Sequence, residues 1–124
     1  MARYVRVASI SFGGTGRADT PEETVRNNLE RMTKLLKKAA MDKPDIVCFP
    51  ECSPTLGLIG EEHVKAAEEI PGEIFQTISN LARRYRMYIV CPMMEKKNGK
   101  AYNSAVLIDR KGEYLGSYHK MTQP

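Results

Sequence analysis

The sequence predicts an α/β fold built on one mixed β-sheet, and two observations support this prediction. Between residues 4 and 92, short apolar segments rich in β-branched side chains alternate with two helical patterns. After residue 92 the hydrophobic period changes and turn signals follow closely, which indicates antiparallel strands added to a β-α-β-α-β start. With 124 residues, the chain is long enough for one domain or for part of one.

The composition is typical of a globular protein, with 42% hydrophobic and 27% charged residues. The formal charge is +4, but Lys and Arg are spread along the chain, whereas nucleic-acid binding requires a basic cluster on one face. No segment has the length of a membrane span, and the N-terminus lacks the apolar core of a signal peptide. We therefore expect neither nucleic acid nor a membrane as partner.

The three cysteines are Cys48, Cys52 and Cys91, an odd number without a repeated pair spacing. This argues against a disulfide framework and favours a reducing compartment, so we expect a cytoplasmic protein. Cys48 and Cys52 have no matching His or Cys at the spacing of a zinc site. We expect no metal and no cofactor.

Residues 4–10 are typical of a first strand, and glycines at positions 13, 14 and 16 end it. A dinucleotide-binding loop would need a further glycine where Asp19 stands, and no Walker lysine follows. We interpret this segment as a flexible turn rather than a nucleotide site.

A helix is predicted to begin at Thr20, which can cap it, with Pro21 at the first helical position and Glu23 completing a capping box. Apolar residues then recur every three or four positions and form one helix face: Val25, Leu29, Met32, Leu36 and Ala39. Basic residues gather toward the C-terminal end, where the helix dipole favours them, and we interpret them as a solvated face.

The apolar segment 45–49 is bounded by prolines and predicts a buried strand, so Glu51 lies where this strand stops. In open α/β sheets, ligands bind at the carboxyl ends of the strands. A partly desolvated carboxylate there would have a raised pKa suited to a general base. The alternative is a solvated loop glutamate.

The remaining segments continue the alternation. A short helix is predicted over residues 61–69, and a second amphipathic helix carries Ile74, Ile78, Leu81 and Tyr85 on one face. The segments after it are a second buried strand that ends in Pro92, a hairpin around Asn98-Gly99, and a further strand, over residues 88–92, 93–109 and 113–120.

Taken in order, these segments resemble the carbon–nitrogen hydrolase family, also called the nitrilase superfamily. The resemblance is carried by the first strand, the capped helix and the segments 44–51, 70–72, 88–90, 102–105, 109–112 and 116–121. It implies an α-β-β-α sandwich, of which residues 1–124 form the N-terminal half, with a mixed sheet and helices on one face. Single segments of this kind are common, but the ordered set is specific.

The resemblance also implies hydrolysis of non-peptide amide or nitrile C–N bonds by a Glu-Lys-Cys triad. By that resemblance Glu51 is the general base and Lys120 is the cation that stabilises the tetrahedral intermediate. Asn103 either hydrogen-bonds near the site, where it could contact substrate, or satisfies backbone groups at a strand start. The nucleophilic cysteine of the family lies on a later strand, so we expect the 124-residue chain alone to be inactive.

The cysteines of the chain are not expected to replace this nucleophile. Cys48, within a strand, and Cys91, at a strand end, are interpreted as small buried hydrophobes. Cys52 directly follows Glu51, and neighbours on an extended segment point to opposite faces.

Three other side chains are expected to have structural roles. His119 should face away from Lys120, His63 should be exposed on a charged helix, and Tyr118 should pack.

Two functional hypotheses follow. The chain is either part of a hydrolase, with a small-molecule amide or nitrile as substrate once completed, or a binding and assembly module that keeps the fold without the chemistry. Either way, we expect self-association or a complementary C-terminal half as partner.

Overall fold

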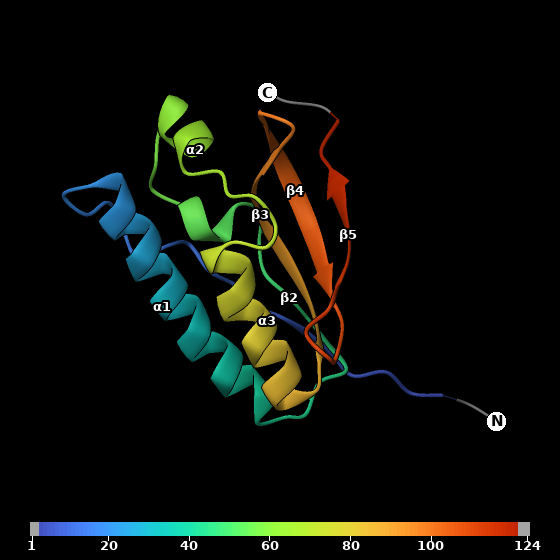
Figure 1. The fold of residues 1–124 in the computed structure, drawn as a ribbon. Coiled ribbons are helices and arrows are strands. Elements are labelled where there is room, and N and C mark those ends of the chain that lie inside the picture. The colour runs from blue at the N-terminus through green and yellow to red at the C-terminus, as the bar shows by residue number, and fades with distance from the viewer. Residues whose placement is uncertain (1–2, 122–124) are drawn as a thin grey trace.

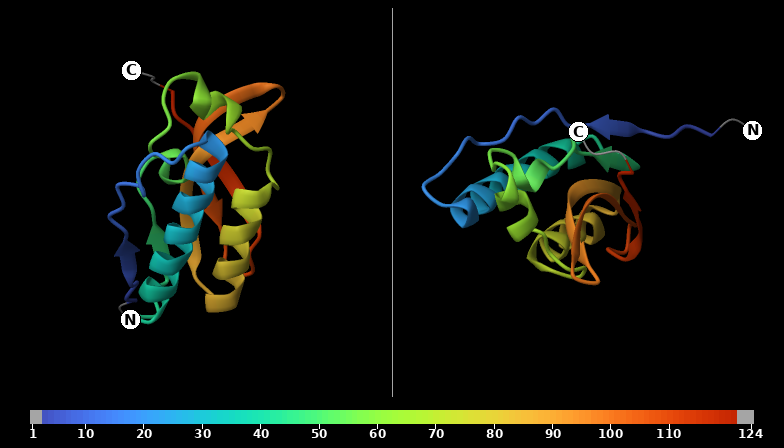
Figure 2. Two further views of the ribbon diagram at one scale, coloured as in Figure 1. Left: turned by 90° about the vertical axis from the view of Figure 1, so that its left-hand side faces the viewer. Right: turned by 90° about the horizontal axis from the view of Figure 1, so that it is seen from above.

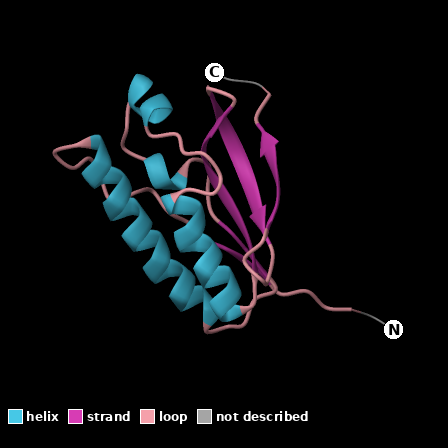
Figure 3. Ribbon diagram, viewed as in Figure 1, coloured by secondary structure: helices cyan, strands magenta, loops and turns pink. Residues whose placement is uncertain are grey.

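The computed structural model describes residues 3–121 and has the predicted α/β architecture (Figures 1 and 3). Its elements, in chain order, are β1 (Val7–Ser9), α1 (Pro21–Ala40), β2 (Ile46–Cys48), the 3-10 turn η1 (Ser53–Thr55), α2 (Glu61–Lys65), α3 (Glu73–Tyr85), β3 (Tyr88–Lys97), β4 (Lys100–Ile108) and β5 (Tyr114–His119). No helix within residues 3–121 combines the length and the apolar character needed to cross a bilayer.

The five strands form one sheet in the order β1-β2-β3-β4-β5. β1, β2 and β3 run parallel, whereas β4 is antiparallel to both β3 and β5, so the sheet is mixed as predicted. Helices α1 and α3 lie side by side along one face of this sheet (Figures 1 and 2). The other face carries no helix within the described residues.

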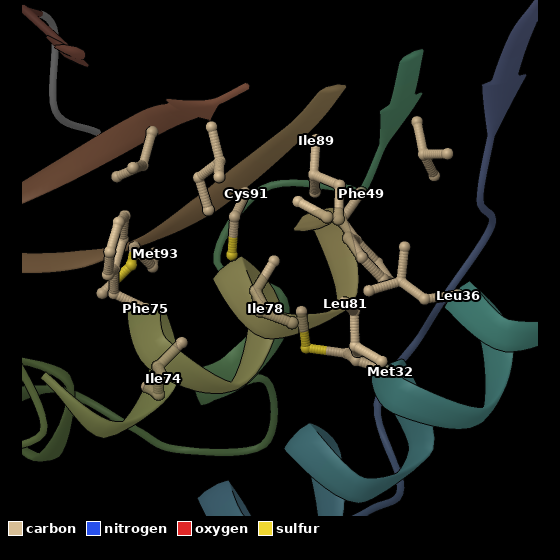
Figure 4. Close-up of a cluster of buried hydrophobic side chains, with 14 of the residues drawn as sticks. Met32, Leu36, Phe49, Ile74, Phe75, Ile78, Leu81, Ile89, Cys91 and Met93 are labelled. Atoms are coloured by element: carbon tan, nitrogen blue, oxygen red, sulfur yellow. The ribbon is translucent and has the colours of Figure 1, made fainter. Parts of the chain in front are cut away.

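The hydrophobic core lies between the sheet and the two long helices (Figure 4). Met32 and Leu36 of α1 and Ile78 of α3 are fully buried against Ile89 and Met93 of β3. These are the inward positions of the two helical patterns and of an alternating strand. The apolar periodicities therefore identified the buried faces correctly.

The N-terminus of α1 has the predicted Thr20 cap and the predicted proline. The Thr20 hydroxyl accepts a hydrogen bond from the Glu23 backbone N–H at 3.1 Å, and Pro21 occupies the first helical position. Two turns further on, the buried Asn28 accepts a bond from the Thr15 N–H at 2.9 Å and donates to the Leu56 carbonyl at 2.8 Å. Asn28 thereby attaches the glycine-containing loop and the segment after η1 to the helix.

The prediction that a strand ends at Pro92 is wrong, because β3 continues through this proline to Lys97. Along the edge of β3 that faces β2, the Val90 carbonyl accepts from the Phe49 N–H and the Met94 carbonyl accepts from the Glu68 N–H. The backbone nitrogen of Pro92, which carries no hydrogen, faces this same edge at a point beyond the last residue of β2. No ladder hydrogen bond is lost there, so the strand tolerates proline.

The helix predicted over residues 61–69 ends at Lys65. Glu68 instead pairs with β3, since its N–H donates to the Met94 carbonyl at 3.2 Å and its carbonyl accepts from the Lys96 N–H at 2.7 Å. The Glu68 carboxylate also accepts a bond from the Ile74 N–H at 2.8 Å, at the start of α3. These long-range bonds outweigh the local helical pattern. The first strand is also shorter than predicted, since β1 spans Val7–Ser9 rather than residues 4–10.

Candidate active site

The candidate site lies on the face of the sheet that the helices leave open. Ser104, Val106 and Ile108 of β4 are buried on the helix side, so Asn103 and Ala105 project from the other side. Glu51 follows β2 in a turn, and Lys120 follows β5. Polar side chains on or just after three different strands therefore lie on one open surface.

The structure brings Glu51 and Lys120 together, as the family resemblance implies. Glu51 Oε1 accepts a hydrogen bond from Lys120 Nζ at 2.7 Å, although 69 residues separate them. The same oxygen accepts a second bond from Asn103 Nδ2 at 3.0 Å. Asn103 also accepts the Lys120 backbone N–H on its carbonyl at 2.8 Å. Asn103 therefore contacts both members of the pair, and its side chain hydrogen-bonds to Glu51 rather than to backbone groups at the strand start.

The electrostatics of Glu51 differ from the expectation. Its side chain is 58% exposed and that of Lys120 is 39% exposed, so burial is slight. The Lys120 ammonium, and after it the Asn103 amide, hold the pKa of Glu51 below its usual value. The predicted rise of this pKa by desolvation is wrong for this chain, because an adjacent cation and a donor outweigh weak burial.

A hollow of about 240 Å³ adjoins the pair, lined by Glu51, Pro92, Asn103, Ser104, Ala105, Tyr118 and Lys120. Tyr118, which lines this hollow, is 65% exposed. The prediction that Tyr118 packs is wrong, because this residue projects from the open face, which no other described element covers. A larger hollow of about 450 Å³ lies between the starts of α1 and α3, but no cysteine, serine or histidine lines it.

The three cysteines have unactivated thiols. Cys91 is buried, which raises its pKa to about 12, in agreement with a structural role. Cys48 is the last residue of β2 rather than a mid-strand residue, and burial raises its pKa too. Cys52 has φ +53° and lies in a turn, so the extended geometry assumed for it is wrong. Burial, followed by the negative charge of Glu51, raises the pKa of the Cys52 thiol.

The two histidines have different surroundings. His119 faces away from Lys120, as predicted, and its Nε2 lies 3.0 Å from Glu95 Oε1 on the helix side of the sheet. The predicted exposure of His63 is wrong, because its ring nitrogens contact Thr55 Oγ1 at 3.0 Å and the Leu58 carbonyl at 2.9 Å.

Glu95 was not singled out from the sequence, yet only 4% of it is exposed. The signal was available in the strand alternation. Residues 89, 91 and 93 of β3 face the core, and the next inward position is Glu95. Within residues 3–121, no three His, Cys, Asp or Glu side chains are grouped as ligands for a metal ion.

Comparisons with known proteins identify the family of this chain. The sequence model of the carbon-nitrogen hydrolase family matches residues 6–123. An omega-amidase, NIT2, of Xenopus tropicalis is 34% identical over 97 residues, covering 76% of this chain and 34% of that protein. A bifunctional nitrilase/nitrile hydratase, NIT4B, of Nicotiana tabacum is 27% identical over 121 residues, covering 83% of this chain and 33% of that protein. The chain spans about a third of the length of these curated relatives.

Solved structures show the same fold. An N-terminal amidase superimposes with a TM-score of 0.79 at 19% identity, over 97% of this chain and 28% of that one. A carbon-nitrogen hydrolase from Helicobacter pylori G27 gives a TM-score of 0.69 at 23% identity, over 97% of this chain and 40% of that one. The five-stranded sheet with its helices is a portion of the nitrilase fold. The chain therefore belongs to the carbon-nitrogen hydrolase family.

Proposed function

We propose that residues 1–124 are the N-terminal part of a hydrolase that cleaves non-peptide amide or nitrile C–N bonds, with Glu51 and Lys120 as two members of its catalytic triad. The observation that carries this proposal is the contact of 2.7 Å between Glu51 Oε1 and Lys120 Nζ beside a hollow. The omega-amidase and nitrilase names of the relatives support the substrate class.

In the proposed reaction with an amide, a cysteine thiol attacks the carbonyl carbon while the Glu51 carboxylate accepts the thiol proton. The Lys120 ammonium stabilises the negative charge that develops on the carbonyl oxygen. The C–N bond then breaks, and ammonia leaves with the proton returned by Glu51. Water then attacks the resulting thioester while Glu51 accepts one of its protons, the C–S bond breaks to release the carboxylic acid, and Glu51 returns the proton to the sulfur. Asn103 would orient the Glu51 carboxylate and could contact the substrate.

The exposure of the pair supports the view that a further layer of polypeptide completes this site. Electrostatic stabilisation of an oxyanion is strong only where water is excluded. Here Glu51 and Lys120 are open to solvent, and each thiol of the chain has a raised pKa. We propose that the nucleophilic cysteine, and the layer that covers the pair, lie outside residues 1–124.

The test measures ammonia release from a panel of terminal amides and simple nitriles. The 124-residue chain alone should give no turnover, whereas the chain joined to the segment that supplies the cysteine should. In the completed enzyme, Glu51→Gln and Lys120→Met should each lower kcat/KM by about 100-fold or more. Glu113→Gln, at an exposed position, is the matched control and should leave it unchanged.

Two results would contradict this proposal. Full activity in both Glu51→Gln and Lys120→Met would remove these residues from the triad. Turnover by the isolated chain that disappears in Cys52→Ala would assign the nucleophile to Cys52 instead.

The second candidate function is a binding or assembly module without chemistry. The observation that favours it is the state of the thiols, since none is activated within the described residues. Specific complex formation with a partner, together with absence of turnover in every completed form, would support this alternative.

A further inference from the structure

Glu95 of β3 is a buried carboxylate that the proposed reaction does not use. It lies on the helix side of the sheet and is 4% exposed. Its Oε1 accepts bonds from the Ser104 hydroxyl at 2.8 Å and from His119 Nε2 at 3.0 Å. Burial alone would raise the pKa of Glu95, but these donors more than offset it and hold the pKa below its usual value. The carboxylate therefore depends on its donors to stay ionised in the interior.

His119 is held on two sides. Besides its bond to Glu95, its ring stacks on Tyr102 of β4, with ring centroids 4.1 Å apart and an interplanar angle of 12°. His119 immediately precedes Lys120. Because successive side chains of a strand point to opposite faces, fixing His119 on the helix side places Lys120 on the open side, beside Glu51.

The strand that carries these residues lies at the edge of the sheet, and its first residue, Tyr114, also contacts Phe75 of α3, with ring centroids 6.0 Å apart. In the described part of the chain, β5 has six residues and pairs only with β4. The pairing includes a register shift between Leu107 and Ile108. A slip of one residue would move Lys120 to the helix side, because the side-chain period of a strand is two. Because Glu95 lies on that side, such a slip would bring Lys120 near a second carboxylate and leave Glu51 without its cation, with Asn103 as its remaining donor.

We propose that Glu95, His119 and Tyr102 form a register lock for β5, and that Glu95 and His119 are positioning residues for Lys120. The imidazole suits this role, since its flat ring can stack on Tyr102 while its N–H reaches Glu95. The inference rests on the proposed function, because the position of Lys120 matters for chemistry only if the Glu51–Lys120 pair is catalytic. Its test uses no activity measurement.

The test follows the carboxyl carbon of Glu51 by NMR titration in the 124-residue chain. In the wild type the pKa of Glu51 should lie below its ordinary value, and Lys120→Met should raise it toward that value. His119→Leu should raise it in the same direction and should remove the cross-strand contacts between residues 104 and 119. His119→Arg should restore the low pKa, because a guanidinium is flat, can stack on Tyr102 and can donate to Glu95.

Two further variants keep the test decisive. If His119→Leu does not fold, the double variant Glu95→Gln with His119→Leu removes the unpaired buried charge and should still show the raised pKa of Glu51. His63→Gln is the matched control, because it perturbs a histidine whose two hydrogen-bond partners, Thr55 and Leu58, do not belong to β5, and it should leave the pKa of Glu51 unchanged.

A folded His119→Leu variant with the wild-type titration of Glu51 and the wild-type register would overturn the lock and leave the proposed function intact. A wild-type Glu51 that titrates at its ordinary value would refute the ion pair, and with it both proposals.

Discussion

At the scale of single residues, one oxygen atom accepts the side-chain hydrogen bonds that join the candidate site. Glu51 Oε1 receives both Lys120 Nζ and Asn103 Nδ2, which lie at different strand positions of the open face. The two donors differ in charge, and the larger lowering of the Glu51 pKa comes from Lys120. Their separate contributions can therefore be measured by removing one donor at a time.

We expect Asn103→Ala to raise the pKa of Glu51, but by less than Lys120→Met does, because it removes a neutral donor and leaves the cation. Carboxyl NMR titration of both variants would check this order. Lys100→Met, at an exposed position on the same strand, is the control. A larger effect of Asn103→Ala than of Lys120→Met would mean that the amide, not the ammonium, controls this carboxylate.

The carboxylate of Glu62 should make the stability of the fold depend on pH. Glu62 pairs with Arg17, which lowers the pKa of Glu62 from 4.5 to about 2. In the unfolded chain this carboxyl regains its ordinary pKa. The pair therefore stabilises the fold fully above about pH 4.5, and the contribution is lost as the pH falls toward about 2, where the folded state also takes up the proton.

We expect Glu62→Gln to lower the free energy of unfolding at neutral pH and to have a progressively smaller effect in acid. Urea denaturation of both proteins between neutral pH and about pH 3 would show the two curves converging. Glu61→Gln, the exposed neighbour, should not change this profile. A difference that is constant with pH would show that the Glu62 charge is not its source.

At the scale of elements, local signals account for the helices, and long-range pairing accounts for the strands. Helix α1 begins where its cap and proline predicted, because Thr20 and Glu23 are three residues apart and need no other segment to meet. Helix α2 is shorter than its pattern, because Glu68 bonds to β3. Strand β3 passes through Pro92, because its neighbour β2 ends before that point.

We expect Thr20→Ala to destabilise the protein by about 1 kcal/mol, since it leaves the Glu23 N–H at the helix start without its side-chain acceptor. Chemical denaturation would measure the loss. Thr20→Ser keeps the hydroxyl and should recover most of the stability. Equal losses in both variants would assign the effect to the threonine methyl group rather than to the cap.

At the scale of the whole molecule, helices cover the sheet on one side only within residues 3–121. Helices α1 and α3 pack on one face (Figure 2), and the opposite face presents Tyr118 together with the candidate site. At the sheet edge, Val5 and Val7 are 65% and 66% exposed around the short strand β1. An unpaired edge strand with apolar side chains promotes pairing with another strand.

We therefore expect the 124-residue chain to self-associate or to bind a complementary segment. Light scattering at micromolar concentration would detect the association. Val7→Lys places a charge on the open edge and should reduce it, whereas Val64→Lys, at a similarly exposed position on α2, should not. A monodisperse wild-type monomer would contradict this expectation and would mean that the chain forms a self-sufficient smaller fold.

The sequence by itself determined the features that depend on near neighbours or on a simple period. These are the start of α1, the buried faces of both long helices, the location of Glu51 at the end of a strand and the opposite orientation of His119 and Lys120. Tertiary structure decided the features that depend on atoms from distant segments. The Glu51 pKa is lowered rather than raised, Cys52 lies in a left-handed turn, and Glu95 is buried beside His119. The physical reason is that a backbone pattern is set by a few adjacent residues, whereas the charge state of a side chain is set by whatever the fold brings within hydrogen-bonding distance of it.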